Sequence, residues 1–285
     1  MKTEKKENFV GCNDDIAGAE VVLAGIPYDV TSTFRHGSDE GPDSARKFSD
    51  SIETFSPDRF DDITDHKIAD AGNLVLASQK PEEAVTEMEA YAESFIEKGK
   101  KMLYICGEHL ISYPIVKMYH KKYPDLKVIY FDAHADMRDD YDGNKLSHSA
   151  AARRISEVVG AKNLFMFGIR SFEKKEMMFI RDNRILCDPL MEEFENVIDT
   201  VKNSPVYISI DVDVIDPGFL PGVGNPEAGG MSYRDFLRAV EGFSGLKNIV
   251  AADINELSPK YDPMGASSVF TAKMIREMLL VMAGN

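Results

Sequence analysis

The feature that most restricts the fold of this chain is an alternation of short apolar runs with longer amphipathic segments. Six runs have the character of buried strands, at residues 20–26, 101–106, 128–132, 164–169, 206–211 and 248–254. Amphipathic segments predict helices at residues 81–100, 147–159, 232–243 and 268–282. Pro81 and Ser232 are typical of helix starts. This alternation is typical of an α/β protein with a parallel sheet covered by helices on both faces.

The chain carries no sign of a division into separate domains. Its 285 residues, 44% of them hydrophobic, suffice for one large core, although the length alone would also allow two smaller domains. We find no internal repeat, no low-complexity tract and no linker rich in Pro, Gly and Ser. We therefore expect one domain over residues 1–285.

The net charge restricts the partners of the protein. A formal charge of −15 would repel nucleic acid and anionic membranes, whereas a cationic substrate is compatible with it. The N-terminal segment MKTEKKENF lacks the apolar stretch of a signal peptide, and we expect a cytoplasmic protein. Three widely spaced cysteines, Cys12, Cys106 and Cys187, predict reduced thiols, with Cys106 buried.

Side chains that can bind metal follow three of the predicted strands. They lie in GEH at residues 107–109, DAHAD at residues 132–136 and DVDVIDP at residues 211–217. In such folds ligands bind beyond the carboxyl ends of the strands. Side chains alternate along an extended backbone, so the donors within DAHAD should share one face, as should those within DVD. The sequence thus predicts that six donors converge: His109, Asp132, His134, Asp136, Asp211 and Asp213.

The charge of this set indicates the number and type of metal ions. Its four carboxylates would repel one another at neutral pH unless cations neutralised them, and two divalent ions match their charge. Carboxylates with a minority of imidazoles suit Mn²⁺ best, with Co²⁺, Ni²⁺, Fe²⁺ and Zn²⁺ as alternatives. Water held between two such ions becomes hydroxide near neutral pH. We therefore expect a hydrolytic centre with two Mn²⁺ ions.

Two further residues have properties that suit catalysis. His148 lies in GNKLSHSAA at the start of a predicted helix, where it could transfer protons. Glu256 lies in DINELSP after the last predicted strand and should face the same crevice. A carboxylate that binds no metal can bind a guanidinium group through paired charge-assisted hydrogen bonds.

Two loops near these motifs need separate interpretations. DPGFLPGVGNPEAGG at residues 216–230 lacks the sequence signature of a phosphate-binding loop, and we expect a shaped loop over the site. The sequence leaves open whether its segment at residues 218–230 moves. Asp139, Asp140 and Asp142 follow DAHAD and predict a solvated loop rather than additional ligands.

Taken together, these motifs resemble those of the ureohydrolase family, which comprises arginases and agmatinases, and most of all its agmatinase branch. The resemblance rests on GIPYDVTSTFRHGSDEGP, GEHLIS, DAHAD, SHSAAARR, SIDVDVIDP and DINELSP, which span most of the chain. It implies a three-layer α/β/α sandwich with a mostly parallel central sheet and a dinuclear manganese centre. It also implies a homo-oligomer, usually a trimer or a hexamer.

The resemblance also implies roles for individual residues. Two metal sites would share Asp132 and Asp211, and the first would add His109 and Asp136 while the second adds His134 and Asp213. The catalytic groups would be His148 as proton shuttle and Glu256 as guanidinium ligand, together with Asp136. One departure is visible, because the common GGDH is CGEH here, with Cys106 and Glu108. His109 is kept, so we expect metal binding to persist, with different packing behind the site.

The implied reaction is hydrolysis of agmatine to putrescine and urea by attack of a metal-bridging hydroxide on the guanidinium carbon. Arginine is the nearest alternative substrate, but the acidic loop RDDYDGNKLSHS would repel its α-carboxylate. Guanidinobutyrate is another alternative. A metal-dependent deacetylase or phosphoesterase is a rival that Glu256 disfavours, because its charge would repel phosphate. A non-catalytic metal-binding homologue is a third reading, which the presence of both His148 and Glu256 disfavours.

Overall fold

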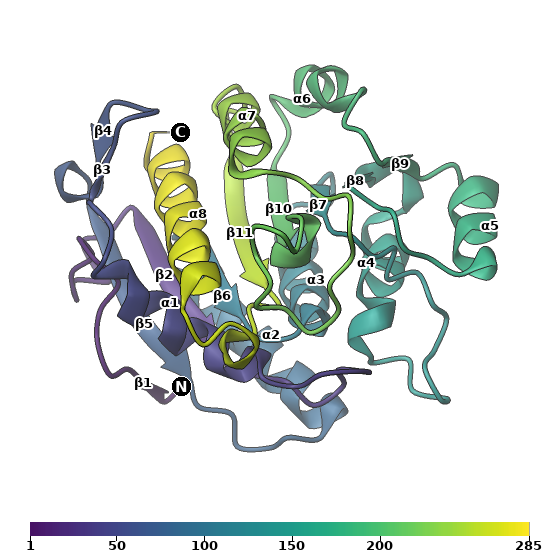
Figure 1. Ribbon diagram of the computed structural model, residues 1–285, viewed down its shortest axis with the longest axis horizontal. Helices are drawn as coiled ribbons and strands as arrows, with labels where there is room; N and C mark the ends of the chain where they lie inside the picture. Colours follow the sequence, from purple (N-terminus) through teal and green to yellow (C-terminus); the bar gives the residue numbers. More distant parts are fainter. Residues whose placement is uncertain (285) are drawn as a thin grey trace.

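A computed structural model describes residues 1–284 of the chain, and its centre is a nine-stranded sheet within these residues. The edge strand β1 is antiparallel to β5, and all other neighbours in this sheet are parallel (Figure 1). In spatial order the strands are β1 (Thr3–Glu4), β5 (Ile68–Leu74), β2 (Val21–Ile26), β6 (Lys101–Cys106), β11 (Ile249–Asn255), β10 (Val206–Asp211), β7 (Lys127–Phe131), β8 (Leu164–Phe167) and β9 (Leu186–Asp188).

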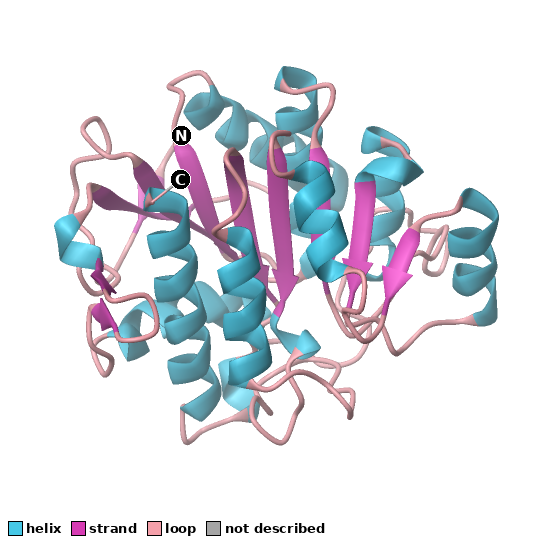
Figure 2. Cartoon of the chain, turned by 90° about the horizontal axis from the view of Figure 1, so that it is seen from above, coloured by secondary structure: helices cyan, strands magenta, loops and turns pink. Residues whose placement is uncertain are grey.

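Helices cover both faces of the sheet and complete three layers (Figure 2). Side chains of one face pack with α1 (Gly41–Ser49), α6 (Phe194–Val201), α7 (Tyr233–Phe243) and α8 (Ala266–Ala283). Side chains of the other face pack with α2 (Pro81–Ile96), α3 (Ser112–Lys122), α4 (Ala151–Val159) and α5 (Lys174–Asn183). A short hairpin, β3 (Phe55–Ser56) with β4 (Asp61–Asp62), lies outside the main sheet. The predicted three-layer α/β/α architecture is confirmed.

Burial on both faces explains why the central strands are continuously apolar. In β6, Leu103 and Ile105 belong to one core, whereas Met102, Tyr104 and Cys106 belong to the core on the opposite face. The prediction that Cys106 is buried is therefore confirmed. None of the helices described is both long and apolar enough to cross a membrane.

The six predicted strands are all present, with small shifts at their ends. The sequence analysis missed the strands β1, β3, β4, β5 and β9 and the four helices α1, α3, α5 and α6. The helix predicted to end at residue 100 ends at Ile96 and is followed by Gly99 with φ 68°. The predicted start at Ser232 is confirmed, because its hydroxyl accepts a hydrogen bond from the Asp235 backbone N–H. Strand β5 was missed because IADAGNL contains polar residues and a glycine that are unusual in a buried strand.

The polar side chains of β5 are compensated by a buried arginine on α1. The Arg46 side chain is 1% exposed, and its guanidinium donates to both carboxylate oxygens of Asp70, at 2.8 and 3.0 Å. It also donates to Asn73 Oδ1 at 2.6 Å. Such bidentate pairing fixes the position of α1 against the sheet. An interaction across distant segments is therefore what permits a polar strand inside this core.

We expect Arg46→Met to lower the free energy of unfolding by about 3–5 kcal/mol, because the variant leaves the buried Asp70 carboxylate without its cation. Urea denaturation measures this change. Arg238 pairs with Asp235 at the surface, so Arg238→Met is a matched control that should change the free energy by no more than about 0.5 kcal/mol. Equal effects of the two variants would contradict the structural role of the buried pair.

Candidate metal centre and active site

The register of the sheet brings the predicted ligand segments to the same edge of the sheet. Four adjacent strands, β6, β11, β10 and β7, end together, since Ile254 pairs with Ile105, Asp211 with Asn255 and Ile210 with Phe131. The segments that follow these strands carry His109, Glu256, the acids of DVD and those of DAHAD. The carboxyl edge of the sheet is therefore where the predicted donors meet.

The donors converge, but the backbone is not the extended one that we expected. Asp213 lies in a 3₁₀ turn, Val212–Val214, whose cap is Asp211, and the Asp211 side chain accepts from the Asp213 backbone N–H. Asp136 adopts a left-handed conformation with φ 47°. Turns rather than alternation along a strand therefore aim these side chains at a common point. The prediction that the donors converge is therefore right, but the expected cause, side chains that share one face of an extended strand, was wrong.

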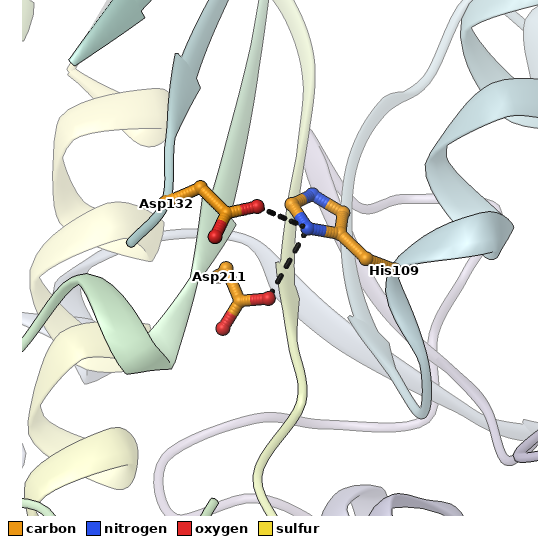
Figure 3. Close-up of side chains that lie close together, drawn as sticks. All are labelled: His109, Asp132 and Asp211. Carbon is orange, nitrogen blue, oxygen red and sulfur yellow. Dashed lines mark ion pairs between the residues drawn. The ribbon is translucent and has the colours of Figure 1, made fainter. Parts of the chain in front are cut away.

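Five of the six predicted ligands form two groups whose donor atoms lie close enough to hold one ion each. The first consists of His109, Asp132 and Asp211, and the second of Asp132, His134 and Asp213. His109 Nδ1 lies 3.0 Å from Asp132 Oδ2 and 3.2 Å from Asp211 Oδ2, as Figure 3 shows. His134 Nδ1 lies 2.8 Å from Asp213 Oδ2. Asp132 is the one residue that both groups contain.

The sixth predicted ligand, Asp136, lies beside the first group. Its Oδ2 atom is 3.7 Å from His109 Nδ1 and accepts a hydrogen bond from the Tyr130 hydroxyl at 3.1 Å. The Tyr130 ring stacks on the His109 imidazole with 4.5 Å between ring centroids. Tyr130 therefore holds both Asp136 and His109 in place, a role that its position within an apolar strand did not indicate.

Hydrogen bonds behind His109 determine which ring nitrogen faces the acids. His109 Nε2 lies 2.9 Å from Ser209 Oγ, and Ser209 donates its own proton to Asp253 Oδ1 at 2.7 Å. Ser209 is therefore the acceptor, and His109 Nε2 carries the proton. With Nε2 engaged by Ser209, Nδ1 is the ring nitrogen that faces Asp132 and Asp211 and the one that a metal ion would use.

The electrostatics of the cluster fit divalent cations. Burial, with the charges of Asp213 and Asp132, raises the pKa of Asp211 well above its ordinary value. Burial and the Asp132 charge raise the pKa of Asp136 to about 8. The Oδ2 atom of Asp132 is buried and accepts no hydrogen bond from any residue that the structure describes. Cations would relieve this repulsion and use the free oxygen, so the donor set fits a metal centre.

A cavity of about 520 Å³ opens above this cluster. Its lining includes Asp136, Asp211 and Asp213, together with His148 and Glu256. Glu256 has φ 67°, an unusual backbone conformation for glutamate, and its Oε1 atom accepts from the His109 backbone N–H at 2.9 Å. Among the residues described, no donor engages Glu256 Oε2. Both His148 and Glu256 therefore lie where the sequence analysis expected them.

His148 is held from three sides. Its Nδ1 atom lies 3.3 Å from Glu256 Oε1, and its Nε2 atom lies 3.1 Å from both the backbone N and the Oγ1 of Thr33. Its backbone N–H donates to Thr31 Oγ1. Burial alone would lower the pKa of His148, but the hydrogen bond to Glu256 and the nearby carboxylate charges raise it to about 9.

Thr31 and Thr33 are site residues that the sequence analysis did not single out. Both lie in TST at residues 31–33, within the longest motif of the family resemblance, which was the available signal. Glu108, the unusual residue of CGEH, accepts from both the backbone N–H and the hydroxyl of Thr31, each at 2.6 Å. Glu108 therefore fixes the threonine segment that contacts His148.

The two predicted loops also have defined places. Asp139, Asp140 and Asp142 are exposed, as expected of a solvated loop, and are absent from the cavity lining. The loop at residues 216–230 lines the cavity through Asn225, Pro226 and Glu227, as expected of a loop over the site. The acids that line the cavity therefore come from other segments than RDDYDGNKLSHS, the loop that we expected to repel the α-carboxylate of arginine.

Comparison with known proteins shows the family to which the chain belongs. The agmatinase of Bacillus subtilis is 38% identical over 275 residues, 95% of each chain. The agmatine ureohydrolase of Thermoplasma volcanium has a TM-score of 0.86 at 29% identity, covering 99% of this chain and 95% of its own. The proclavaminate amidino hydrolase of Streptomyces clavuligerus has a TM-score of 0.88 at 26% identity, covering 99% and 98%. Residues 19–281 match the Arginase family, and the chain belongs to that family.

Proposed function

We propose that this protein is an agmatinase that hydrolyses agmatine to putrescine and urea. The observation that carries the proposal is the charge around the cavity. Beyond the metal-binding acids, four carboxylates line it, those of Glu173, Glu176, Glu227 and Glu256, against the single guanidinium of Arg138. Such a cavity favours a substrate that is cationic along its length. The names of the relatives in the family agree with this choice of substrate.

The metal ions belong to the same proposal. We infer that His109, Asp132, Asp136 and Asp211 hold one ion and that Asp132, His134, Asp211 and Asp213 hold the other, with Mn²⁺ as the physiological metal. The membership of Asp132 in both geometric groups supports its bridging role, while bridging by Asp211 stays a prediction. When bound, such a pair of ions supplies a hydroxide at neutral pH and offsets negative charge.

Glu256 orients the substrate in this scheme. Its Oε1 atom is occupied by the His109 backbone N–H, which fixes the carboxylate, and its Oε2 atom is available to the cavity. A guanidinium that donates to Glu256 Oε2 is held over the metal ligands, with its carbon directed at them. The same contact stabilises positive charge on the guanidinium nitrogens while water adds to the carbon.

His148 supplies a proton to the departing amine. The backbone N–H of Thr33 can donate to Nε2 when the imidazole is neutral, and Thr33 Oγ1 can accept from Nε2 when it is protonated. Both protonation states therefore have a partner at the same ring nitrogen. This arrangement suits a group that gains and loses a proton in each turnover.

The residues that line the cavity also distinguish between the alternative substrates and activities. Arginine and guanidinobutyrate each carry a carboxylate, which the cavity acids would repel. A phosphoesterase is disfavoured by Glu256 for the same reason, and a deacetylase would have no use for a carboxylate suited to guanidinium. The proclavaminate amidino hydrolase shares the fold, so another guanidino compound is the strongest alternative substrate. A non-catalytic homologue is disfavoured by the intact contact between His148 and Glu256.

Three expectations concern the whole protein and stay predictions. We propose that residues 1–285 form one domain, which is supported by the single large sheet of the described residues. We also propose a homo-oligomer, a trimer or a hexamer, and a cytoplasmic location. Light scattering and cell fractionation test the latter two.

The substrate assignment predicts a ranking of guanidino compounds. After loading with Mn²⁺, we expect urea release from agmatine with a kcat/KM at least about tenfold higher than from arginine or guanidinobutyrate, because each of these adds a repelled carboxylate. A colorimetric urea assay across the three compounds measures the ranking. Urea from none of the guanidino compounds would refute the proposed function, and a preference for guanidinobutyrate would refute the substrate.

The metal assignment predicts that Asp132→Ala and Asp211→Ala each abolish urea release and lower the bound metal from about two ions per chain. Elemental analysis of the purified variants measures the metal content. Asp140→Ala removes an equal charge from the exposed loop and should keep both ions. An unchanged metal content in either of the first two variants would contradict the bridging role of that residue.

The role of His148 predicts a distinct pH dependence. Because the pKa of His148 is raised to about 9 in the free enzyme, the protonated donor is present below that pH, and kcat/KM should fall as the pH rises through about 9. His148→Asn should lower kcat by about 10²- to 10⁴-fold and remove this alkaline fall. His66→Asn, at a residue that is not part of the cavity lining, is the matched control. A variant that keeps the alkaline fall would exclude His148 as its source.

A further inference from the structure

Most carboxylates of the cavity already have a partner within the protein. Glu173 Oε1 lies 2.7 Å from Arg138 Nη1, which neutralises its charge. Glu176 accepts from the backbone N–H groups of Met137 and Glu173, at 2.9 and 2.6 Å. Glu256 is the group assigned to the guanidinium. These three carboxylates are therefore committed before any second cationic group enters.

Glu227 is the remaining carboxylate, and it is held in place without being neutralised. Its Oε1 atom accepts from the Ser171 hydroxyl at 2.9 Å, and no cation contacts it among the residues described. Its backbone carbonyl accepts from Arg170 Nη2 at 2.8 Å, which anchors the loop at this point. A half-buried carboxylate without a cation is partly desolvated and uncompensated, so a ligand cation would stabilise it.

We propose that Glu227 binds the distal ammonium group of the substrate and so selects a diamine-like guanidine over other guanidino compounds. The inference rests on the proposed function, because agmatine presents one cation to Glu256 and has a second at the other end of its methylene chain. The cavity offers one uncommitted carboxylate for each of these two charges. The same negative charge would oppose the α-carboxylate of arginine or the terminal carboxylate of guanidinobutyrate.

The surroundings of Glu227 fit an aliphatic chain that ends in an ammonium group. Ser171, which orients Glu227, is followed by Phe172, and both Phe172 and Phe34 line the cavity. Their rings offer apolar surface to methylene groups, and the carboxylate offers acceptors to the amine at the end. The segment at residues 171–173 and the loop that carries Glu227 therefore form the recognition surface together.

The test compares agmatine with butylguanidine, which has the same four-carbon chain with a hydrogen atom in place of the terminal ammonium group. We expect Glu227→Gln to lower the ratio of kcat/KM for agmatine to that for butylguanidine by about 10- to 100-fold, mainly through the KM for agmatine. Ser171→Ala, which frees the carboxylate, should lower the same ratio by a few-fold. Glu227→Lys should shift the preference from agmatine toward guanidinobutyrate.

The control is Asp142→Asn, which removes one negative charge from an exposed residue outside the cavity and should leave the ratio within about twofold of wild type. If the wild-type protein hydrolyses agmatine but Glu227→Gln keeps the ratio, or slows both substrates equally, the inference is wrong while the proposed function stands. If the wild-type protein releases urea from no guanidine, the proposed function fails and the inference fails with it.

Discussion

Repulsion among buried carboxylates is the constraint on which the rest of this structure depends. Asp132, Asp136, Asp211 and Asp213 gather at the carboxyl edge of the sheet, where burial raises the pKa of three of them. A protein can keep such a group together only if the surrounding fold is rigid and cations offset the charge. Four adjacent parallel strands provide the rigidity, and hydrogen bonds from Tyr130 and from backbone N–H groups fix the individual oxygens. Cations would supply the remaining stabilisation, so folding of the site and metal binding are coupled.

Strain is located at the same edge. Asp136 and Glu256 both adopt left-handed backbone conformations, which cost free energy for residues other than glycine. Each conformation is held by hydrogen bonds, since the Asp136 carbonyl accepts from Arg153 and the Glu256 N–H donates to the Gly107 carbonyl. The stability that tolerates this strain comes from elsewhere, from two continuous apolar cores and from the buried pair of Arg46 with Asp70. Function and stability are therefore carried by different parts of the sheet.

Sequence reasoning reached most of the site but less of the fold around it. The donors were found because polar residues directly after apolar strands are conspicuous, and strands β6, β7 and β10 are apolar enough to be recognised. Strand β5 was missed because its Asp70 and Asn73 are acceptable only beside Arg46, 24 and 27 residues away in sequence. Thr31 and Thr33 were missed as site residues because the sequence around a threonine does not indicate which residue its hydroxyl will contact. Their contacts with Glu108 and His148 join segments more than 70 residues apart, a distance that local patterns do not span.

The contact between His148 and Glu256 couples substrate binding to acid strength. The hydrogen bond and charge of Glu256 are the main reasons that His148 holds its proton so firmly. A guanidinium on Glu256 would offset that charge, and the proton affinity of His148 would fall once the substrate is in place. His148 would then be a weak, fully protonated acid in the absence of substrate and a stronger acid once substrate is bound. Its readiness to give up a proton would thus be set by occupancy of the cavity rather than by the pH of the surrounding solution alone.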